Sequence, residues 1–247
     1  MDSLYKEDLA YIEAAAFGGL AQGAAPEVLR LLNAAAIPIR QVLDIGCGAG
    51  PLTAALVQAG FEATGIDQSA ELLAIARASV PQARFIHNSI YAAEMPPCEA
   101  ILAVGEPLTY HAEGVDGDTL VKGFLERASD LLPSGGILIF DVIELGEPSL
   151  ASRAWSSGDD WAVLVDTEEN KDSRTLVRDI QTFRRVDRFY RRGHEVHRVR
   201  LFDTRTLLDQ LATRGFTTET AQAYGAHRLG PRRRAFFCTR KYGPAAG

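Results

Sequence analysis

The sequence of 247 residues has few cysteines, no long apolar run and no excess of positive charge, the features typical of disulfide-rich, membrane-spanning and nucleic-acid-binding proteins. Its three cysteines form neither a disulfide framework nor a zinc spacing, and Cys47 lies inside a glycine-rich stretch, which favours a reducing compartment. No apolar run is long enough to cross a membrane, and the acidic start Met1-Asp2-Ser3 is unlike a signal peptide. The net charge of −6 gives no general attraction to nucleic acid or anionic lipid. We therefore expect a cytoplasmic protein.

One stretch, residues 41–52, carries most of the information that is present. Val42, Leu43 and Ile45 form the short apolar run typical of a buried parallel strand, and helical periodicity begins at Leu52. Between them lie three glycines at alternate positions, 46, 48 and 50. Glycines let the backbone turn sharply and approach a ligand without a Cβ in the way. The pattern predicts a loop that contacts a polar small molecule.

Two residues argue against a dinucleotide as this ligand. Pro51 occupies the place where a dinucleotide-binding loop needs its third glycine. Asp44 would repel a pyrophosphate but would suit a ligand that carries an ammonium or sulfonium charge. Together with Thr64-Gly65-Ile66-Asp67, the stretch from Val42 to Gly50 resembles the nucleotide-binding half of the class I S-adenosylmethionine (SAM)-dependent methyltransferases. The resemblance implies SAM as cofactor and S-adenosylhomocysteine as product.

The resemblance also implies which residues contact SAM. Asp67, about twenty residues beyond the loop, is expected to bind the ribose hydroxyls, although an acid in a surface turn would look the same in the sequence. Family members often bind the adenine amino group with an acid after the third strand, where this chain has Ser89. Ser89, Asn88 and the backbone at Ile90 are the replacements we expect. The predicted cofactor residues are Asp44, Gly46, Cys47, Gly48, Gly50, Asp67, Gln68, Ser89, Ile90 and Gly105.

Two residues are candidates for catalysis. Glu106 follows the fourth strand at the ligand-binding edge, where it could remove a proton, orient an acceptor, hold the SAM ammonium, or only stabilise its loop. His197 shares one strand face with Glu195, so it could be a base oriented by that acid or half of a polar cross-strand pair. A magnesium site formed by Glu106 and Asp141 is a further alternative, but we predict no metal site.

The fold class that we predict is α/β, with a Rossmann-like, mostly parallel seven-stranded sheet whose last strand is antiparallel and whose two faces are covered by helices. We expect one methyltransferase domain over residues 1–247. Residues 1–40 would form a helical cap, 41–145 and 201–247 the SAM-binding core, and 146–200 an inserted antiparallel sheet that acts as a lid or substrate wall. The expected cap helices are Tyr5–Phe17 and Pro26–Ala36, interrupted by glycines. The expected turns in the insertion lie at Glu168–Asp172 and Arg192–His194.

The cap also offers aromatic residues. In related methyltransferases such a segment closes over the cofactor, which would make Tyr5, Tyr11 and Phe17 lid residues; packing on the core is the alternative. The chain further resembles an uncharacterised bacterial branch that carries the patterns Gly105-Glu106, Asp160-Trp161 and Glu195-Val196-His197.

The function that we predict is transfer of the SAM methyl group to an oxygen or nitrogen atom of a small-molecule acceptor. Methylation of RNA or protein is one alternative, because the insertion is rich in arginine, but acids such as Asp179, Asp187 and Glu195 are interleaved with it. The second alternative is a SAM-binding protein without transferase activity. The Asn-Pro-Pro-Tyr pattern of enzymes that methylate nucleobase amines or glutamine amides is not seen.

Overall fold

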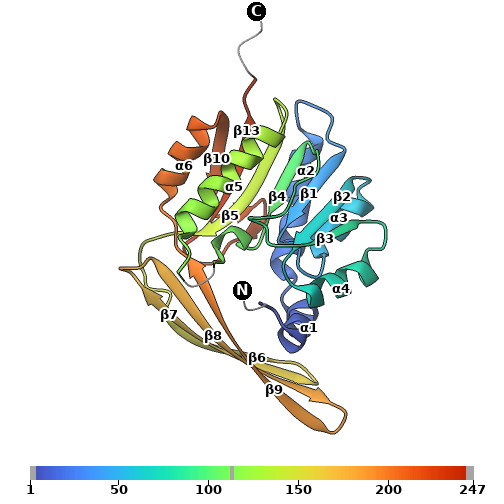
Figure 1. Cartoon of the computed structure of the whole chain (residues 1–247), viewed down its shortest axis with the longest axis vertical. Coiled ribbons are helices and arrows are strands. Elements are labelled where there is room, and N and C mark those ends of the chain that lie inside the picture. Colours follow the sequence, from blue (N-terminus) through green and yellow to red (C-terminus); the bar gives the residue numbers. More distant parts are fainter. Residues whose placement is uncertain (1–3, 112–113, 243–247) are drawn as a thin grey trace, which may run out of the picture.

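The computed structural model describes residues 4–111 and 114–242, and its centre is a seven-stranded β-sheet (Figure 1). The strand order is β10-β13-β5-β4-β1-β2-β3. The strands are β1 (Gln41–Ile45), β2 (Glu62–Asp67), β3 (Arg84–His87), β4 (Ala100–Ala103), β5 (Ile137–Ile143), β10 (Phe216–Ala221) and β13 (Arg233–Arg240). Residues 1–3, the acidic start on which the expectation about a signal peptide rests, lie outside the described residues.

The pairing confirms the predicted fold class. β1 pairs in parallel with β2 and β4, β2 with β3, and β4 with β5. β13 runs antiparallel to both β5 and β10. β10 ends at Ala221, and the next strand, β11 (Ala223–Tyr224), pairs with β12 (His227–Arg228) in a separate two-stranded sheet. The strand order reverses between β1 and β4, and ligands of open parallel sheets bind beyond the carboxyl ends of the strands at such a point.

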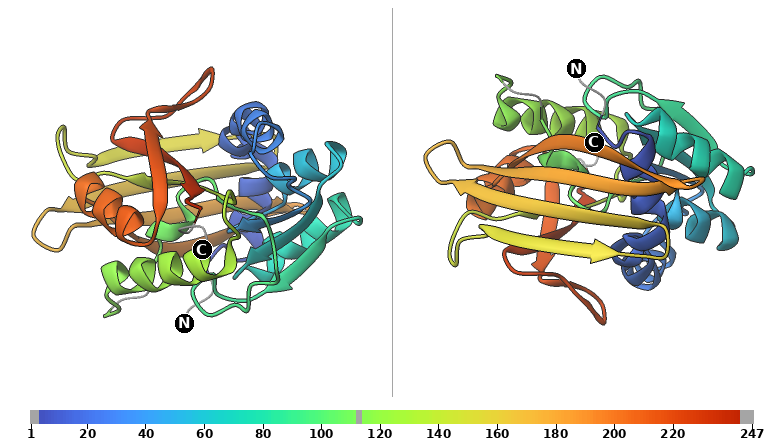
Figure 2. Two further views of the ribbon diagram at one scale, coloured as in Figure 1. Left: turned by 90° about the horizontal axis from the view of Figure 1, so that it is seen from above. Right: turned by 90° about the horizontal axis from the view of Figure 1, so that it is seen from below.

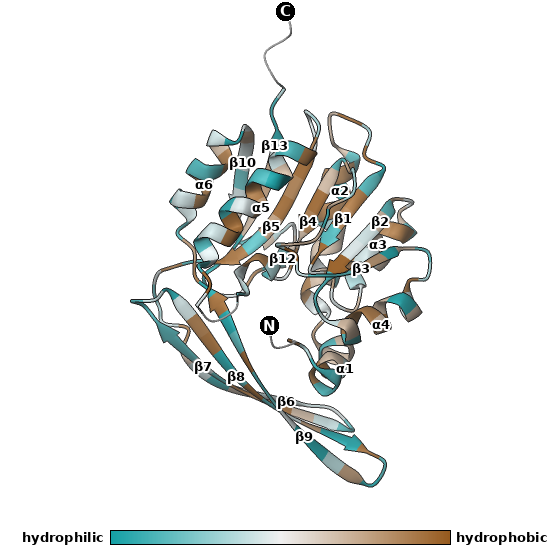
Figure 3. Ribbon diagram, in the orientation of Figure 1, coloured by the Kyte–Doolittle hydropathy of each residue, from teal (hydrophilic) through white to brown (hydrophobic). Residues whose placement is uncertain are grey.

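Helices cover both faces of the sheet, as predicted (Figure 2). α2 (Gly19–Asn33) and α3 (Pro51–Gln58) pack on one face, and α5 (Gly117–Leu131) and α6 (Thr204–Thr213) on the other. The central strands are the most hydrophobic part of the ribbon (Figure 3), and all seven residues of β5 are buried. This is the pattern of strands covered on both faces, and in such sheets ligands bind at the edge where the strands end.

Local sequence explains where several helices begin. Gly50, with φ 84°, directly precedes α3, and Pro51 is the first residue of that helix. Ser69 caps α4 (Ala70–Ser79), since its Oγ accepts the N–H of Leu72 at 3.1 Å. The second cap helix differs from the prediction, because α2 begins at Gly19 and continues through Gly23 and Pro26. A Cβ on Gly23 would lie 2.1 Å from Nδ1 of His227, so close packing rather than a helix break requires this glycine.

A second, antiparallel sheet follows β5 (Figure 1). Its strands are β6 (Ser152–Ser157), β7 (Trp161–Asn170), β8 (Thr175–Val186) and β9 (Phe189–Arg200). The predicted turn at Arg192–His194 is wrong, because these residues lie within β9 and the chain turns instead at Asp187, which has φ 56°. A Cβ on Gly193 would lie 2.5 Å from Oγ1 of Thr182. That glycine lets β8 and β9 approach each other and does not mark a turn.

The N-terminal helix α1 (Glu7–Ala16) lies between this second sheet and the core (Figure 1). Leu9 and Ile12 are buried against Trp161 and neighbouring apolar residues of the second sheet. The carboxylate of Asp8 receives two hydrogen bonds from Arg191, at 2.7 and 2.5 Å. These contacts of α1 therefore hold the second sheet over the carboxyl ends of the core strands.

Within the described ranges, no helix is long and apolar enough to cross a membrane.

Candidate cofactor and acceptor site

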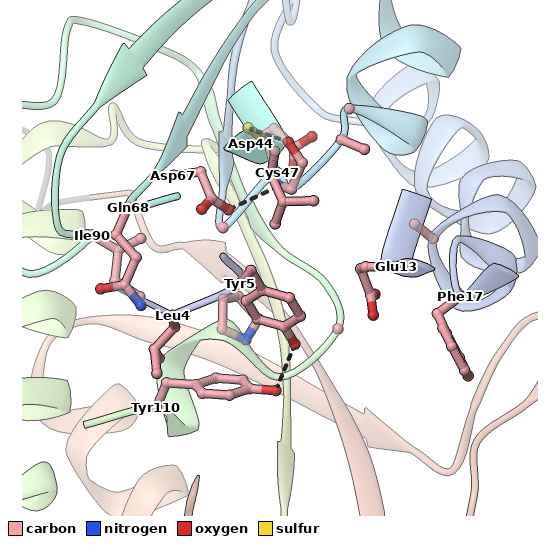
Figure 4. A pocket seen from close by; sticks show the side chains of 18 of the residues that line it. Leu4, Tyr5, Glu13, Phe17, Asp44, Cys47, Asp67, Gln68, Ile90 and Tyr110 are labelled. Carbon is pink, nitrogen blue, oxygen red and sulfur yellow. Dashed lines mark hydrogen bonds between the residues drawn. The ribbon is translucent and has the colours of Figure 1, made fainter. Parts of the chain in front are cut away.

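A cavity of about 1000 Å³ lies beyond the carboxyl ends of β1, β2 and β4 (Figure 4). Its walls come from the glycine loop, the exits of β2, β3 and β4, the helices α1 and α2, and β9. All ten predicted cofactor residues line it: Asp44, Gly46, Cys47, Gly48, Gly50, Asp67, Gln68, Ser89, Ile90 and Gly105. The structure thus brings together residues that come from four strand ends of the sequence.

The glycine loop depends on backbone conformations that other residues rarely adopt. Gly46, Gly48 and Gly50 have φ values of 69°, 53° and 84°. A Cβ on Gly46 would lie 2.3 Å from Cβ of Pro107, so protein packing requires that glycine. A Cβ on Gly48 would meet no atom nearer than 4.0 Å, and Gly48 lines the cavity. The open side of Gly48 is therefore a cradle that a ligand can fill.

Two carboxylates flank this cradle. The N–H groups of Gly48 and Ser69 donate to Asp67 at 2.9 and 2.8 Å, which fixes its carboxylate at the cavity wall. Thr53 Oγ1 donates to Asp44 at 2.5 Å. Burial raises the pKa of both acids, that of Asp44 to about 6, and the hydrogen bonds oppose this rise. Asp67 retains acceptor capacity for ligand hydroxyls, and a cationic ligand would compensate the buried charge of Asp44.

Asp141, at the end of β5, shapes the exit of β4. It accepts the N–H groups of Gly105 and Glu106 at 2.9 and 3.0 Å and the hydroxyl of Tyr224 at 2.7 Å. Burial, with the charge of Glu106, raises the pKa of Asp141 to about 7. Among residues 4–111 and 114–242, no group of three or more His, Cys, Asp or Glu side chains is placed to hold a metal ion. Asp141 acts on the backbone that presents Gly105 to the cavity.

The carboxylate of Glu106 lies behind the cavity wall, in contrast to its neighbours Gly105 and Pro107, which line it. The residue is 4% exposed. Its carboxylate receives a hydrogen bond from Arg178 Nη2 at 3.1 Å and forms an ion pair with Arg233 Nε. Of the roles weighed from the sequence, this geometry favours stabilisation of the loop over proton removal.

His197 is also buried behind the wall, with 1% exposure. Its Nε2 lies 3.0 Å from Oε2 of Glu195, and its ring packs against Tyr5 and Tyr110 at centroid distances of 4.9 and 5.8 Å. Tyr5, Tyr110 and Glu195 line the cavity, whereas His197 does not. The pair expected from the sequence is present, and its geometry favours a supporting role for the histidine.

Glu195 fastens the N-terminal segment across the cavity. Its carboxylate accepts the N–H groups of Tyr5 and Lys6 at 2.7 and 2.9 Å. The carbonyl of Tyr5 accepts the hydroxyl of Ser69 at 2.9 Å, and the Tyr5 and Tyr110 hydroxyls lie 3.1 Å apart. These contacts join residues 5–6 to the cap of α4 and to β9. The segment therefore closes one side of the cavity.

The three aromatic residues of the cap differ in position. Tyr5 and Phe17 line the cavity (Figure 4). Tyr11 instead donates its hydroxyl to Asp160 at 2.9 Å, and the guanidinium of Arg184 lies 3.7 Å from its ring centroid. Tyr11 thus fastens α1 to the second sheet.

One residue of this wall was not singled out from the sequence. Glu13 lines the cavity, and its carboxylate points into it (Figure 4). Burial raises the pKa of Glu13 to about 7; the charge of Arg178 lowers it and that of Asp67 raises it. The sequence does contain a signal, because Glu13 lies four residues from Leu9 and four from Phe17, in the row of a helix that is otherwise apolar.

Comparison with known proteins bears on the class of protein to which this fold belongs. Residues 42–136 match the family model described as "Methyltransferase domain". The family model assigns residues 42–136 to a methyltransferase domain, and the fold and the glycine loop of the chain agree with those of a class I SAM-dependent methyltransferase. A protein of Geobacillus sp. (strain WCH70) whose name describes it as a methyltransferase is 31% identical over 109 residues, which are 42% of this chain and 42% of that protein. YqeM of Bacillus subtilis, also named as a methyltransferase, is 26% identical over 71% of this chain and 73% of its own length.

The chain thus spans less than half of the length of the first of these relatives. Among solved structures, SAM-bound CalS10, an amino pentose methyltransferase from Micromonospora echinaspora, superposes with a TM-score of 0.74 over 94% of this chain and 97% of its own. At 17% identity, this likeness shows the shared fold alone.

Proposed function

We propose that this methyltransferase transfers the methyl group of SAM to a nitrogen or oxygen atom of a small molecule. The observation that carries the proposal is the cavity of about 1000 Å³, in which the glycine loop and Asp67 share one space with an aromatic region formed by Tyr5, Phe17 and Tyr110. Ligand pockets span about 300 to 1000 Å³, so this cavity lies at the upper end of the range. The space therefore suits a cofactor together with a small acceptor.

The residues present fit SAM. The cradle at Gly48 admits a ligand against the backbone, and Gly105, with φ 95°, leaves comparable room at the exit of β4, where a Cβ would meet nothing nearer than 4.0 Å. We assign Asp67 to the ribose hydroxyls, Ser89 and Ile90 to the adenine, and Asp44 to the cationic end of the cofactor. When bound, SAM supplies an electrophilic methyl group on a sulfonium.

Besides binding SAM, the protein must position the acceptor and exclude water. Displacement at a methyl carbon needs an acceptor lone pair held close and in line, and such positioning can supply about 7 to 11 kcal/mol of the barrier reduction. The segment fastened by Glu195 and Ser69 closes the cavity beside Tyr5. We infer that this segment opens for exchange of the cofactor and closes for transfer.

The closed wall also bears on the alternatives. A nucleic acid or a folded protein would have to pass a target base or side chain between α1 and β9, which are joined by the contacts of Asp8 and Glu195. A small molecule can enter while the N-terminal segment is open and is enclosed completely when the segment closes. CalS10 is an amino pentose methyltransferase, and an acceptor of that size is in keeping with the proposal.

Methyl-labelled SAM tests the proposal. The purified chain is incubated with it and, separately, with the small-molecule, RNA and protein fractions of a bacterial extract. We expect label in the small-molecule fraction, with stoichiometric formation of S-adenosylhomocysteine. Label in RNA or protein would replace the proposal by the corresponding alternative. Tight SAM binding without any label transfer would indicate a SAM-binding protein.

A further inference from the structure

Glu13 stands apart from the other acids of the cavity wall. The carboxylate of Asp44 is held by Thr53, that of Asp67 by backbone N–H groups, and that of Glu195 by the N-terminal segment and His197. Over the described residues, the Glu13 carboxylate has no hydrogen bond or ion pair, although it is directed into the cavity (Figure 4). Glu13 is half-buried, and a carboxylate withdrawn from water without a partner is costly, so a ligand group is the natural complement.

The groups that face Glu13 define the chemistry of this place. Asp67 at the end of β2 and Arg178 on β8 exert opposite effects on its charge. The phenols of Tyr5 and Tyr110 lie on the same side, and burial raises the pKa of both above the ordinary value. Arg178 is itself engaged, since it donates to the Tyr110 hydroxyl at 3.0 Å and to Glu106 at 3.1 Å. Both phenols stay protonated near neutral pH, which leaves Glu13 as the proton acceptor of this wall.

We propose that Glu13 binds the amino group of the methyl acceptor and takes a proton from it, so that the acceptor is a basic amine and not an alcohol or a carboxylic acid. This inference rests on the function proposed above. The geometry that carries it is an unpartnered carboxylate aimed into the space bounded by Tyr5, Tyr110 and the exit of β4.

The proposed step balances in atoms and charge. An ammonium acceptor gives one proton to the Glu13 carboxylate, which becomes a carboxylic acid, and the free nitrogen lone pair forms a bond to the methyl carbon. The carbon–sulfur bond breaks, its electron pair stays on sulfur, and S-adenosylhomocysteine leaves. The methylated nitrogen carries the positive charge that the sulfonium lost. A base with a pKa of about 7 suits this proton transfer at neutral pH.

SAM itself also carries a protonated amine, so the experiment must separate two sources of the same group. The first arm uses trideuteriomethyl SAM with the small-molecule fraction of a bacterial extract, and the position of the label is read by fragmentation in mass spectrometry. We expect the label on a nitrogen that is basic in the unmethylated compound. Label on oxygen would overturn the assignment of Glu13 and leave the proposed function intact; label on carbon, or no labelled small molecule, would overturn both.

The second arm uses the amine identified in the first and the variant Glu13→Gln. We expect kcat/KM for the amine to fall by about 100-fold or more, with loss of the rise in rate near pH 7, while the Kd for SAM stays within about twofold. Retained SAM binding shows that the variant is folded. Glu94→Gln removes an exposed acid outside the cavity and serves as control. A tenfold weaker SAM affinity with unchanged acceptor kinetics at saturating SAM would place Glu13 on the cofactor, and unchanged values throughout would give it no role.

Discussion

Replacement of Asp67 by asparagine tests the cofactor half of the site. The native carboxylate accepts two backbone N–H groups, of Gly48 and Ser69, and has capacity left for ligand hydroxyls. An amide keeps the shape but offers a single acceptor oxygen and no charge. Since a hydrogen bond to a charged group contributes about 1.5 to 3 kcal/mol, and the amide recovers part of this, we expect SAM binding to weaken by about 1 to 3 kcal/mol. This corresponds to a Kd that is about 5- to 150-fold higher.

Isothermal titration calorimetry with SAM and with S-adenosylhomocysteine measures this change. Glu62→Gln is a matched control, because Glu62 begins the same strand at its opposite end and is exposed, with a single long contact of 3.4 Å from Gln41. Thermal unfolding of both variants shows whether they fold. An Asp67→Asn variant that is folded and binds SAM with the native Kd would refute the assignment of Asp67 to the ribose.

Three further outcomes follow from the structure. Glu106→Gln leaves two arginines with a weaker buried partner, and we expect it to lower the free energy of unfolding by about 3 kcal/mol. The control Glu126→Gln loses only an exposed ion pair and should cost at most about 1 kcal/mol. Equal losses for the two variants in chemical denaturation would contradict this reasoning. Gly46→Ala should lower stability more than Gly60→Ala, by about 1 to 3 kcal/mol, because both have positive φ but only Gly46 faces an atom at 2.3 Å; calorimetric melting compares them. Glu13 has a folded pKa of about 7, above its unfolded value, so its contribution to stability falls as pH rises from about 4 to 7. Glu13→Gln should therefore make the ligand-free protein less sensitive to pH over this range, and an unchanged slope would show that Glu13 does not titrate there.

Much of the fold could be predicted from the sequence because its signals are local. The apolar runs of β1 and β5 belong to strands covered on both faces, and the glycines at 46, 48 and 50 occupy positive φ values that the sequence pattern anticipates. Gly193 and Gly23 misled the prediction for a physical reason. Each permits close packing against a distant partner, a use of glycine that the local pattern does not distinguish from a turn.

The candidate site, like the fold, has parts that the sequence predicts and parts that it does not. The cofactor residues follow strand ends, so the parallel sheet brings them to one cavity without further information. The surroundings of Glu106 and His197 depend on long-range contacts: Arg233 is 127 residues from Glu106, and Tyr5 is 190 residues from Glu195. Such ion pairs and hydrogen bonds form only when the chain folds and brings two sheets and a helix together. The sequence alone therefore could not show that both candidates lie behind the cavity wall.

A crystal structure with S-adenosylhomocysteine would show whether one cavity holds both the cofactor and the acceptor. We expect the ribose hydroxyls at Asp67 and the adenine beside Ser89 and Ile90. We also expect the sulfur to face a remaining space bounded by Tyr5, Glu13 and the exit of β4. A ligand bound elsewhere, or a sulfur turned toward bulk solvent with no enclosed space before it, would show that the cavity does not hold both molecules.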